Sequence, residues 1–465
     1  MNRTKYLLKN MGILTISNFA SKILVFLLVP LYTTVLSTVE YGTYDLAVST
    51  VTLLYPIISL NIVDAVMRFS MDKEYSKEKI AVIGFKLISI STVIFAIAMI
   101  FFNKFKIWPE INGLEGFVFL YYFSYVFNQF LIQFAKGMER VREMGIAGVI
   151  STLVMVGGNI FFLLVLKEGL PGFFLANIIA QEISAIYLLI KLKLWIYLKQ
   201  LNVDKILIKE MLAYCIPLLA STIGWWVNSA ADKYVVAFIL GVSANGILSV
   251  SYKVPQIINV VQSIFIQAWQ ISAIKEYGEK DTAIFYGKTF LIINVLMCAA
   301  CSWLILLTRP LAYLMYAKDF FQAWQYVPFL LISSVFNCAS GLLGPILSAQ
   351  KNSKAMMWSA ITGASVNIIM NITLVHYIGI QGATIATLIC SIIIYEVRRI
   401  AVGKDIIIEH YKVVIVTWLL LCVQAFVEIY LKACAIEIIL MIVMLIINKK
   451  NLYTILYNSK GLVAK

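Results

Sequence analysis

The sequence predicts an all-α integral membrane protein with about 14 transmembrane helices, arranged as two parallel six-helix repeats followed by two C-terminal helices. Three observations lead to this prediction. Of the 465 residues, 61% are hydrophobic and only 13% are charged, which is too little charge to cover a soluble protein of this length. Apolar segments of transmembrane length recur along the whole chain. Lys and Arg are concentrated in every second connection between these segments.

The apolar segments define the expected helices, because a helix needs about 20 mostly apolar residues to cross a bilayer. The first segment follows Arg3, Lys5 and Lys9, as a secretory signal would. Its apolar run continues to Leu36, which is too long for a signal core, so we interpret it as an uncleaved helix. No connection is long enough to form a separate soluble domain. We expect helices at residues 11–36, 44–69, 80–102, 115–136, 144–166, 170–194, 211–240, 244–271, 283–307, 322–349, 355–378, 380–402, 411–431 and 433–448.

The distribution of Lys and Arg tests this number of helices independently. If both termini are cytoplasmic, the inner segments hold 28 of the 38 cationic side chains and the outer loops hold six. This bias is the one that the positive-inside rule describes, so we expect a bacterial cytoplasmic (inner) membrane protein with both termini in the cytoplasm. A net charge of +14 would favour nucleic acid as the partner of a soluble protein, but this pattern argues against nucleic acid here. Four further lysines lie within predicted helices: Lys22, Lys86, Lys233 and Lys253.

Three short matches at nearly one offset indicate that the chain repeats itself. The segment Leu36–Gly42 matches Leu240–Gly246, Val126–Asn128 matches Val335–Asn337, and Gly169–Gly172 matches Gly379–Gly382. Each repeat holds six helices, an even number, so both copies keep the same orientation in the membrane. Parallel halves with a substrate bound between them suit alternating access. We therefore expect an N-terminal lobe at 1–200, a C-terminal lobe at 201–403, and two extra helices with a cytoplasmic tail at 404–465.

The Cys and His residues argue against metal chemistry and against most enzymes. Cys298 and Cys301 have the spacing of a metal motif, but no further Cys or His lies near them in sequence. An acyltransferase would need a membrane-embedded catalytic His, and His376 has no acidic residue near it in sequence. A polysaccharide polymerase would usually present a large external loop, and the longest outer loops here have about a dozen residues. We expect no cofactor and no catalytic residue.

Polar side chains form one long face on the expected helix 244–271. At 100° per residue they occupy a sector about 120° wide over nearly the whole span. Such a face is unfavourable against lipid, so it either lines water or packs on another polar helix surface, and we favour water. Pro255 lies within this helix and permits a bend. The face consists of Ser249, Lys253, Gln256, Asn259, Ser263, Gln267 and Gln270.

Lys22 lies near the middle of the first expected helix, on the same face as Asn18. A charge at membrane depth costs ~2.5–3.5 kcal/mol on insertion scales, so it needs a partner or a hydrated cavity. We interpret Lys22 and Asn18 as cavity-lining residues. The alternative is a lysine that reaches the interface or forms a structural pair.

Other charged residues could have either a local structural role or a functional role. Asn228 and Asp232 lie one turn apart on the expected helix 211–240 and could hold a proton or Na⁺ as a coupling ion. An ion pair between Asp232 and a lysine such as Lys233 is the alternative. Asp64 and Arg68 have the i, i+4 spacing of a local ion pair, which we favour over a binding role.

Two further charges fall within predicted helices. Lys86 is close enough to the inner end of its helix for its ammonium to reach the interface. Glu182 lies in the middle of the helix 170–194, and we expect it to pair with one of the buried lysines.

Several segments resemble the polysaccharide-transporter flippases of the multidrug/oligosaccharidyl-lipid/polysaccharide (MOP) superfamily. The resemblance covers essentially the whole chain through loose motifs. It implies two six-helix lobes in a V shape like that of multidrug (MATE) transporters, extra C-terminal helices, and transport of undecaprenyl-pyrophosphate-linked sugar units. The segments that carry it are Leu7–Asn10, Asn18–Lys22, Val29–Tyr32, Glu40–Tyr44, Ala65–Phe69, Asp232–Tyr234, Gly246 and Ser251–Pro255.

The chemistry of such a substrate agrees with the residues. A pyrophosphate group carries about two negative charges and needs cations in a low-dielectric region. We therefore expect Lys22 and Lys253, which lie on opposite repeats, to bind pyrophosphate, and the amide-rich face of helix 244–271 to bind sugar hydroxyls. We expect a monomer that contacts membrane lipid and works beside the polysaccharide assembly machinery.

Two other transport functions stay open at this point. A multidrug exporter of the same superfamily would bind cationic drugs through acidic residues, and the first expected helix offers Lys22 without a carboxylate. A flippase for the peptidoglycan lipid precursor would use similar chemistry. The sequence does not identify the sugar repeat unit.

Overall fold

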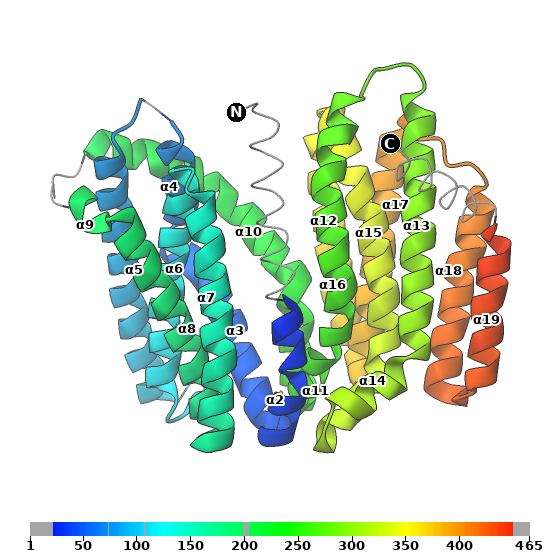
Figure 1. Cartoon of the computed structure of the whole chain (residues 1–465), viewed down its shortest axis with the longest axis horizontal. Coiled ribbons are helices and arrows are strands. Elements are labelled where there is room, and N and C mark those ends of the chain that lie inside the picture. Colours follow the sequence, from blue (N-terminus) through cyan, green and yellow to red (C-terminus); the bar gives the residue numbers. More distant parts are fainter. Residues whose placement is uncertain (1–21, 73, 107, 199–203, 450–465) are drawn as a thin grey trace. The chain divides into compact units, whose positions relative to one another are not determined.

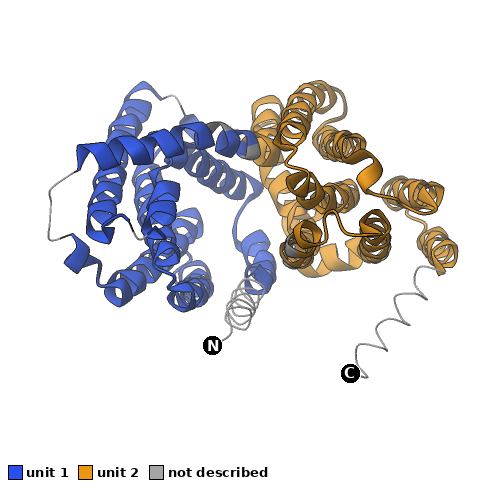
Figure 2. Ribbon diagram, turned by 90° about the horizontal axis from the view of Figure 1, so that it is seen from above, with its two compact units in different colours: residues 1–226 blue, residues 227–465 orange. Residues whose placement is uncertain are grey.

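The computed structural model describes residues 22–72, 74–106, 108–198 and 204–449, and in these ranges the fold is all-α without a β-strand. Asn18, one of the predicted cavity residues, lies outside the described residues. The chain divides into two compact units, residues 1–226 and 227–465 (Figure 2). The boundary falls inside the long helix α10 (Lys205–Leu240).

Unit 1 is a helical bundle in which α6 (Glu115–Gly137) contacts most of the other helices (Figure 1). Aromatic packing contributes much of its core. For example, Tyr122 stacks on Phe95 with a ring-centroid distance of 3.9 Å. In chain order the elements are α2 (Val29–Val35), α3 (Thr38–Ile58), α4 (Ile62–Ser70), α5 (Lys77–Phe105), η1 (Pro109–Ile111), α6, α7 (Val141–Ile160), η2 (Phe161–Val165), α8 (Gly169–Leu192), α9 (Leu194–Tyr197) and the first part of α10.

Unit 2 packs around α15 (Val327–Ala349), whose side chains are mostly buried and which contacts α12, α13 and α17. Its elements after α10 are α11 (Val242–Ser251), α12 (Lys253–Lys275), α13 (Thr282–Leu306), α14 (Thr308–Met315), η3 (Lys318–Tyr326), α15, α16 (Ser353–Ile378), α17 (Ile380–Val402), η4 (Gly403–Asp405), α18 (Tyr411–Phe426), η5 (Val427–Leu431) and α19 (Cys434–Ile447).

Helix occurs in every one of the fourteen segments expected from the sequence, as far as those segments are described. Eleven helices in the described ranges are long and apolar enough to cross a membrane, and the pair α3 and α4, bent by 63°, would make a twelfth span. The first and last expected spans contain the shorter apolar helices Lys22–Val35 and Cys434–Ile447. The membrane character of the fold is therefore confirmed, and the number fourteen stays a prediction.

The matching Gly-x-x-Gly segments occupy equivalent turns in the two units. Gly169, the first residue of α8, and Gly379, the residue before α17, both have positive φ angles, +57° and +64°. A Cβ on Gly172 would lie 3.0 Å from the Phe162 side chain, and one on Gly382 would lie 2.3 Å from the Leu374 carbonyl oxygen. The first glycine of each pair thus adopts the left-handed conformation that other residues disfavour, and the second lets two helices pack closely.

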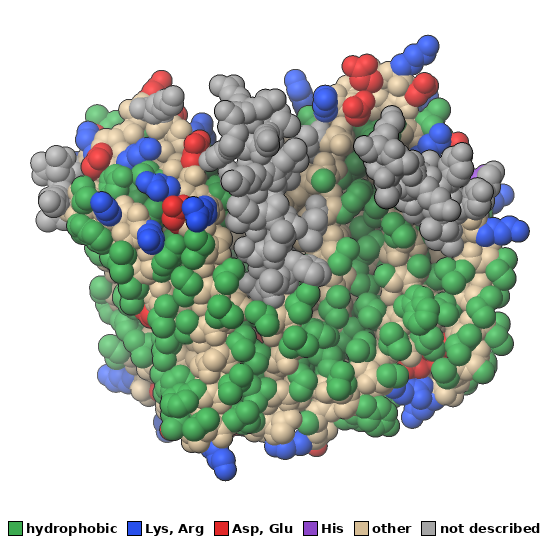
Figure 3. All heavy atoms as spheres, viewed as in Figure 1, with side chains coloured by type: hydrophobic (Ala, Val, Ile, Leu, Met, Phe, Trp, Pro, Cys, Tyr) green, Lys and Arg blue, Asp and Glu red, His purple; other side chains and the backbone are tan. Residues whose placement is uncertain are grey.

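Side chains sort by depth in a way that suits a bilayer. On the face shown in Figure 3, hydrophobic side chains cover the middle of both units, and most Lys and Arg side chains lie near the ends of the helices. This arrangement is the one expected for a protein whose outer surface contacts lipid.

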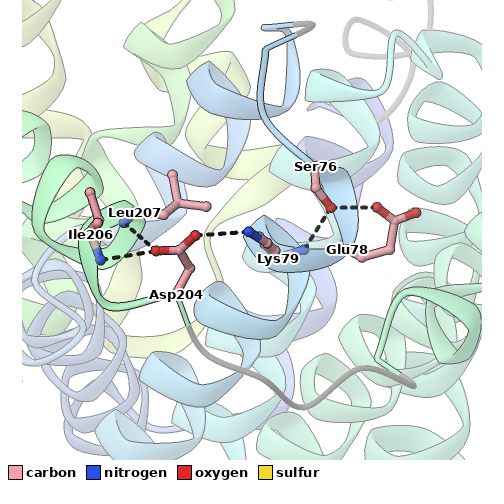
Figure 4. A network of polar contacts seen from close by, with 6 residues as sticks. All are labelled: Ser76, Glu78, Lys79, Asp204, Ile206 and Leu207. Atoms are coloured by element: carbon pink, nitrogen blue, oxygen red, sulfur yellow. Dashed lines mark hydrogen bonds and ion pairs between the residues drawn. The ribbon is translucent and has the colours of Figure 1, made fainter.

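At one end of unit 1, two helix caps are joined by an ion pair (Figure 4). The Asp204 carboxylate accepts hydrogen bonds from the Ile206 and Leu207 amides at the start of α10, at 3.1 and 3.2 Å, and its other oxygen lies 2.9 Å from Lys79 Nζ. Ser76 caps α5 by accepting from the Lys79 amide. The hydrogen bond from Lys79 lowers the pKa of Asp204. Because the pKa of Asp204 is lowered, the ion pair is formed at every pH above the usual pKa range of Asp. The pair is lost only when the pH falls below that range.

Candidate functional site

A buried polar cluster in unit 2 joins α10, α11, α12 and α17. Asp232 on α10 is 4% exposed and accepts a hydrogen bond from the Tyr252 hydroxyl. That hydroxyl also lies 3.5 Å from Thr387 Oγ1 on α17. Tyr252 forms the junction between α11 and α12, so one tyrosine links a buried carboxylate to three other helices.

Asn228 lies one turn before Asp232 on α10, as the sequence predicts. Its Oδ1 is buried and has no hydrogen-bond partner among the described residues. A buried amide oxygen without a donor is unfavourable unless something outside the protein satisfies it. Within the described ranges, no three His, Cys, Asp or Glu side chains come together as a metal site. The cluster can hold a proton on the carboxylate, or a monovalent cation on oxygen ligands.

The expected helix 244–271, in which Pro255 permits a bend, corresponds in the structure to two helices, α11 and α12, separated by the single residue Tyr252. The helix is interrupted at Tyr252, between α11 and α12. Pro255 has no N–H to bond the carbonyl of Ser251, so the regular backbone hydrogen-bond pattern is interrupted at this turn. The Gln256 amide again donates to the Tyr252 carbonyl, and the helix continues regularly from there.

The interruption divides the predicted polar face into a buried part and an exposed part. Ser249 on α11 is 3% exposed, and its hydroxyl lies 3.4 Å from Asn245 Oδ1, so it belongs to the interior of unit 2. The Ser263 hydroxyl is satisfied by the Val260 carbonyl of its own helix at 2.8 Å. The amide side chains Gln256, Asn259, Gln267 and Gln270 are exposed.

The opposite side of α12 explains why this row is uncovered. Trp269 is buried, and its indole N–H donates to the Leu342 carbonyl of α15 at 2.8 Å. Val254 and Ile258 are also buried. Unit 2 therefore packs on the apolar side of α12, and the amide row on the other side is exposed.

The two lysines predicted to bind pyrophosphate belong to different units. Lys22 is an exposed residue at the start of the described chain, in the helix 22–35 of unit 1. Lys253 is the first residue of α12 in unit 2 and is half-buried. Their approach to each other stays a prediction.

The expected ion pair between Asp64 and Arg68 is wrong. The Asp64 carboxylate accepts from the Asn61 side-chain amide at 2.8 Å, and the Arg68 guanidinium lies 3.9 Å from Asp72. These partners follow from where Asp64 and Arg68 lie on α4. Asp64 lies in its first turn, beside the bend at Asn61, and Arg68 lies in its last turn, from which it reaches forward to Asp72.

The remaining predicted charges are placed as follows. The Lys233 amide donates to Asp232 Oδ1 at 2.9 Å, so at least the backbone of this lysine contacts the carboxylate. Glu182 on α8 is half-buried and makes no hydrogen bond or ion pair within the described part of the chain. Lys86 is half-buried on α5.

The sequence analysis missed two charged sites in unit 2. The Arg398 side chain links α17 to its neighbours, because Nε lies 3.1 Å from Ser359 Oγ and Nη1 lies 3.0 Å from the Ser340 carbonyl oxygen. Arg309 forms an ion pair with Glu428 at 3.0 Å, and the only sequence signal for this pair was a carboxylate inside an apolar segment.

Solved structures with a similar fold are transporters. The lipid II flippase MurJ in an inward closed conformation matches with a TM-score of 0.72 and 15% identity, over 96% of this chain and 99% of that one. An inward-facing multidrug resistance MATE family transporter of the MOP superfamily matches with a TM-score of 0.62 and 15% identity, over 84% of this chain and 95% of that one. A MOP superfamily transporter from Pyrococcus furiosus matches with a TM-score of 0.56 and 15% identity, over 85% and 96% of the two chains.

The fold is therefore that of MurJ and the MATE transporters, as the resemblance in the sequence implied. No curated protein matches the sequence significantly. The model of the family "Polysaccharide biosynthesis protein" matches residues 7–270, which is more than half of the chain. The protein belongs to this polysaccharide biosynthesis family.

Proposed function

We propose that the protein is a flippase that moves undecaprenyl-pyrophosphate-linked oligosaccharides from the cytoplasmic to the outer leaflet by alternating access, for polysaccharide export. The observation that carries this proposal is the match to the polysaccharide biosynthesis family over residues 7–270, in a chain with a transporter fold. The lipid tail stays in the bilayer during the movement, and only the pyrophosphate and the sugars need a polar route.

The charge of the headgroup determines what the route must offer. A pyrophosphate without counter-charges is unfavourable at low dielectric, because the loss of hydration is larger than any gain from neutral groups. Lys22 from unit 1 and Lys253 from unit 2 supply these counter-charges.

The sugars need hydrogen bonds to neutral polar groups rather than to charged ones. The exposed amides of Gln256, Asn259 and Gln267 on α12 can each donate and accept, which suits hydroxyl groups in any orientation. Such a row would tolerate several sugar repeat units.

The cluster around Asp232 is the proposed coupling site. Asp232 is held by Tyr252 and lies one turn from Asn228, whose Oδ1 has no hydrogen-bond partner in the described part of the chain; this group of oxygens can bind a proton or Na⁺. Its occupancy would alter the link that Tyr252 makes between Asp232 on α10 and Thr387 on α17, and so would couple an ion gradient to transport.

Replacement of both lysines tests the anion-binding part of the proposal. The variant Lys22→Gln/Lys253→Gln should fail to complement a strain that lacks its polysaccharide flippase, and lipid-linked oligosaccharide should accumulate in the inner leaflet. Lys354→Gln is the matched control, because Lys354 is an exposed lysine at the start of α16. Full complementation by the double variant, at equal membrane abundance, would exclude these lysines as the pyrophosphate site.

Two assays distinguish the alternatives within transport. Rescue of a strain depleted of its lipid II flippase, without rescue of polysaccharide export, would assign the protein to the peptidoglycan precursor. Resistance to a panel of cationic drugs, lost in Asp232→Asn, would instead indicate a drug exporter.

A further inference from the structure

A second buried charge cluster lies in unit 2 and joins the last two helices to α14. The Arg309 guanidinium holds the Glu428 carboxylate at both oxygens, through Nε and Nη2, each at 3.0 Å. Nη2 also lies 3.0 Å from the Glu428 carbonyl oxygen. Glu428 is 3% exposed, so its charge is neutralised by a bidentate ion pair inside the protein.

A second carboxyl group lies against this ion pair. Glu437, in the first turn of α19, is 1% exposed, and its carboxyl group is in hydrogen-bonding contact with that of Glu428. Its Oε2 has no hydrogen-bond partner among the described residues. Two ionised carboxylates only accept hydrogen bonds, so contact between them is favourable only when one of them carries a proton.

The surrounding cations do not balance the second carboxylate. Lys432 is exposed, and its ammonium lies 5.9 Å from the centre of the Trp324 ring, not in an ion pair with either glutamate in the described structure. The Arg309 guanidinium lies over the same ring at 5.0 Å. The other cations on helices that pack on α19 are Lys288 and Lys412, which are exposed and belong to the far ends of α13 and α18.

The remaining contacts of the last two helices in this region are neutral. Gln424 on α18 exchanges two hydrogen bonds with Ser302 on α13, at 2.7 and 3.0 Å. The side-chain amide of Asn448 donates to Thr417 Oγ1 at 2.9 Å, at the other end of α19. These two contacts do not titrate. The charged contact of α18, in which the Tyr411 hydroxyl donates to Glu396 at 3.2 Å, lies at the start of that helix, at the opposite end from Glu428.

We propose that Glu428 and Glu437 form a carboxyl pair that binds one proton, and that this proton holds the start of α19 against η5 and α14. Glu437 is the neutral acid and donates to Glu428, which stays ionised and paired with Arg309. When the proton leaves, two buried negative charges face one guanidinium, and α19 loosens at this end. The site lies outside the proposed substrate and coupling residues, so its test is independent of the proposed function.

Infrared difference spectroscopy on the full-length protein in lipid nanodiscs tests the proton directly. At neutral pH the wild type should show the C=O band of a buried carboxylic acid, sensitive to ²H₂O, which disappears as the pH is raised. Glu437→Gln should lose this band. Glu428→Gln should also lose the band, because Glu437 would then be the only carboxyl group beside Arg309 and would be ionised. A wild type without the band, or a band that survives in Glu437→Gln, would overturn the assignment.

Thermal unfolding as a function of pH supplies the second measurement. The folded pair holds a proton that an unfolded Glu does not hold at neutral pH, so the stability of the wild type should fall as the pH rises. Glu437→Gln should unfold at a temperature that depends much less on pH and should exceed the wild type at alkaline pH. The control Glu409→Gln removes an exposed carboxylate just before α18 and should follow the wild type. If Glu437→Gln destabilises the protein equally at every pH, Glu437 acts as an anion and the proposal is wrong.

The same scans with Na⁺, K⁺ or choline as the only monovalent cation separate a proton from a metal cation. Equal curves in the three salts support a proton site. Stabilisation by Na⁺ at alkaline pH that is absent in Glu437→Gln would show that the pair takes a metal cation instead.

Discussion

At the scale of single residues, the Tyr252 hydroxyl donates a hydrogen bond to the buried Asp232 carboxylate on α10. Asp232 was recognisable in the sequence because an acid inside an apolar segment is unusual. Tyr252 was not, because a tyrosine in an apolar segment gives no indication of where its hydroxyl group points. Its role depends on the turn between α11 and α12, which brings the ring to α10 and α17.

Tyr252→Phe should therefore destabilise the protein and impair transport. Removal of the hydroxyl leaves the buried carboxylate without this donor, at a cost of about 1–3 kcal/mol. Tyr377→Phe is the control, because Tyr377 is 77% exposed on α16. Unfolding temperature and complementation are measured for both variants, and equal behaviour would contradict a structural role for the Tyr252 hydroxyl. Asp232→Asn/Tyr252→Phe should lose less stability than the sum of the single variants, since the two groups act as a pair.

At the scale of elements, the repeated Gly-x-x-Gly segment shows how a weak sequence match gains a physical meaning. The sequence shows only that two glycines recur at a fixed spacing. The structure shows that the first of each pair reverses the chain between two helices and that the second, Gly172 or Gly382, permits close helix packing.

Gly382→Ala should destabilise unit 2, because a Cβ at this position would meet the carbonyl group of Leu374 at 2.3 Å. Overpacking of this kind costs about 1–3 kcal/mol, or more where backbone must move. The control Gly148→Ala adds a Cβ with no atom within 4 Å and should be neutral or stabilising by about 0.5–1 kcal/mol. Thermal unfolding of the purified variants measures the difference, and no difference between them would refute the packing argument.

Helical periodicity did not predict the exposure of every residue on the polar face of α11 and α12. A polar sector that continued from Ser249 to Gln270 predicted one helix with one hydrated face. In the structure Ser249, on α11 before Tyr252, is buried in unit 2, whereas Gln256 and Gln270, on α12 after it, are exposed. Pro255 signalled that a bend was permitted, but the direction of the bend depends on what packs on each side, which is a tertiary property.

At the scale of the whole molecule, the distribution of charge determines topology. The excess of Lys and Arg in alternate connections predicts an even number of spans and two cytoplasmic termini. A green fluorescent protein fused after Lys465 should fluoresce, because it folds in the cytoplasm. Alkaline phosphatase inserted after Lys167, in a predicted outer loop, should be active, and the same enzyme inserted after Lys193 should be inactive. Phosphatase activity from a fusion after Lys465 would contradict the predicted orientation.

The sequence by itself determined the membrane environment, the helical class, the positions of most helices and the family, because hydrophobic length and charge distribution act locally along the chain. It also singled out Asp232 and Asn228, since polar groups in apolar segments stand out in any single sequence. Only the tertiary structure decided the partners of the charges: Asp64 with Asn61, Arg68 with Asp72, and Glu428 with Arg309 and Glu437. Ion pairs and hydrogen bonds form over a few ångströms in space, and residues such as Arg309 and Glu428 become neighbours only when their helices pack.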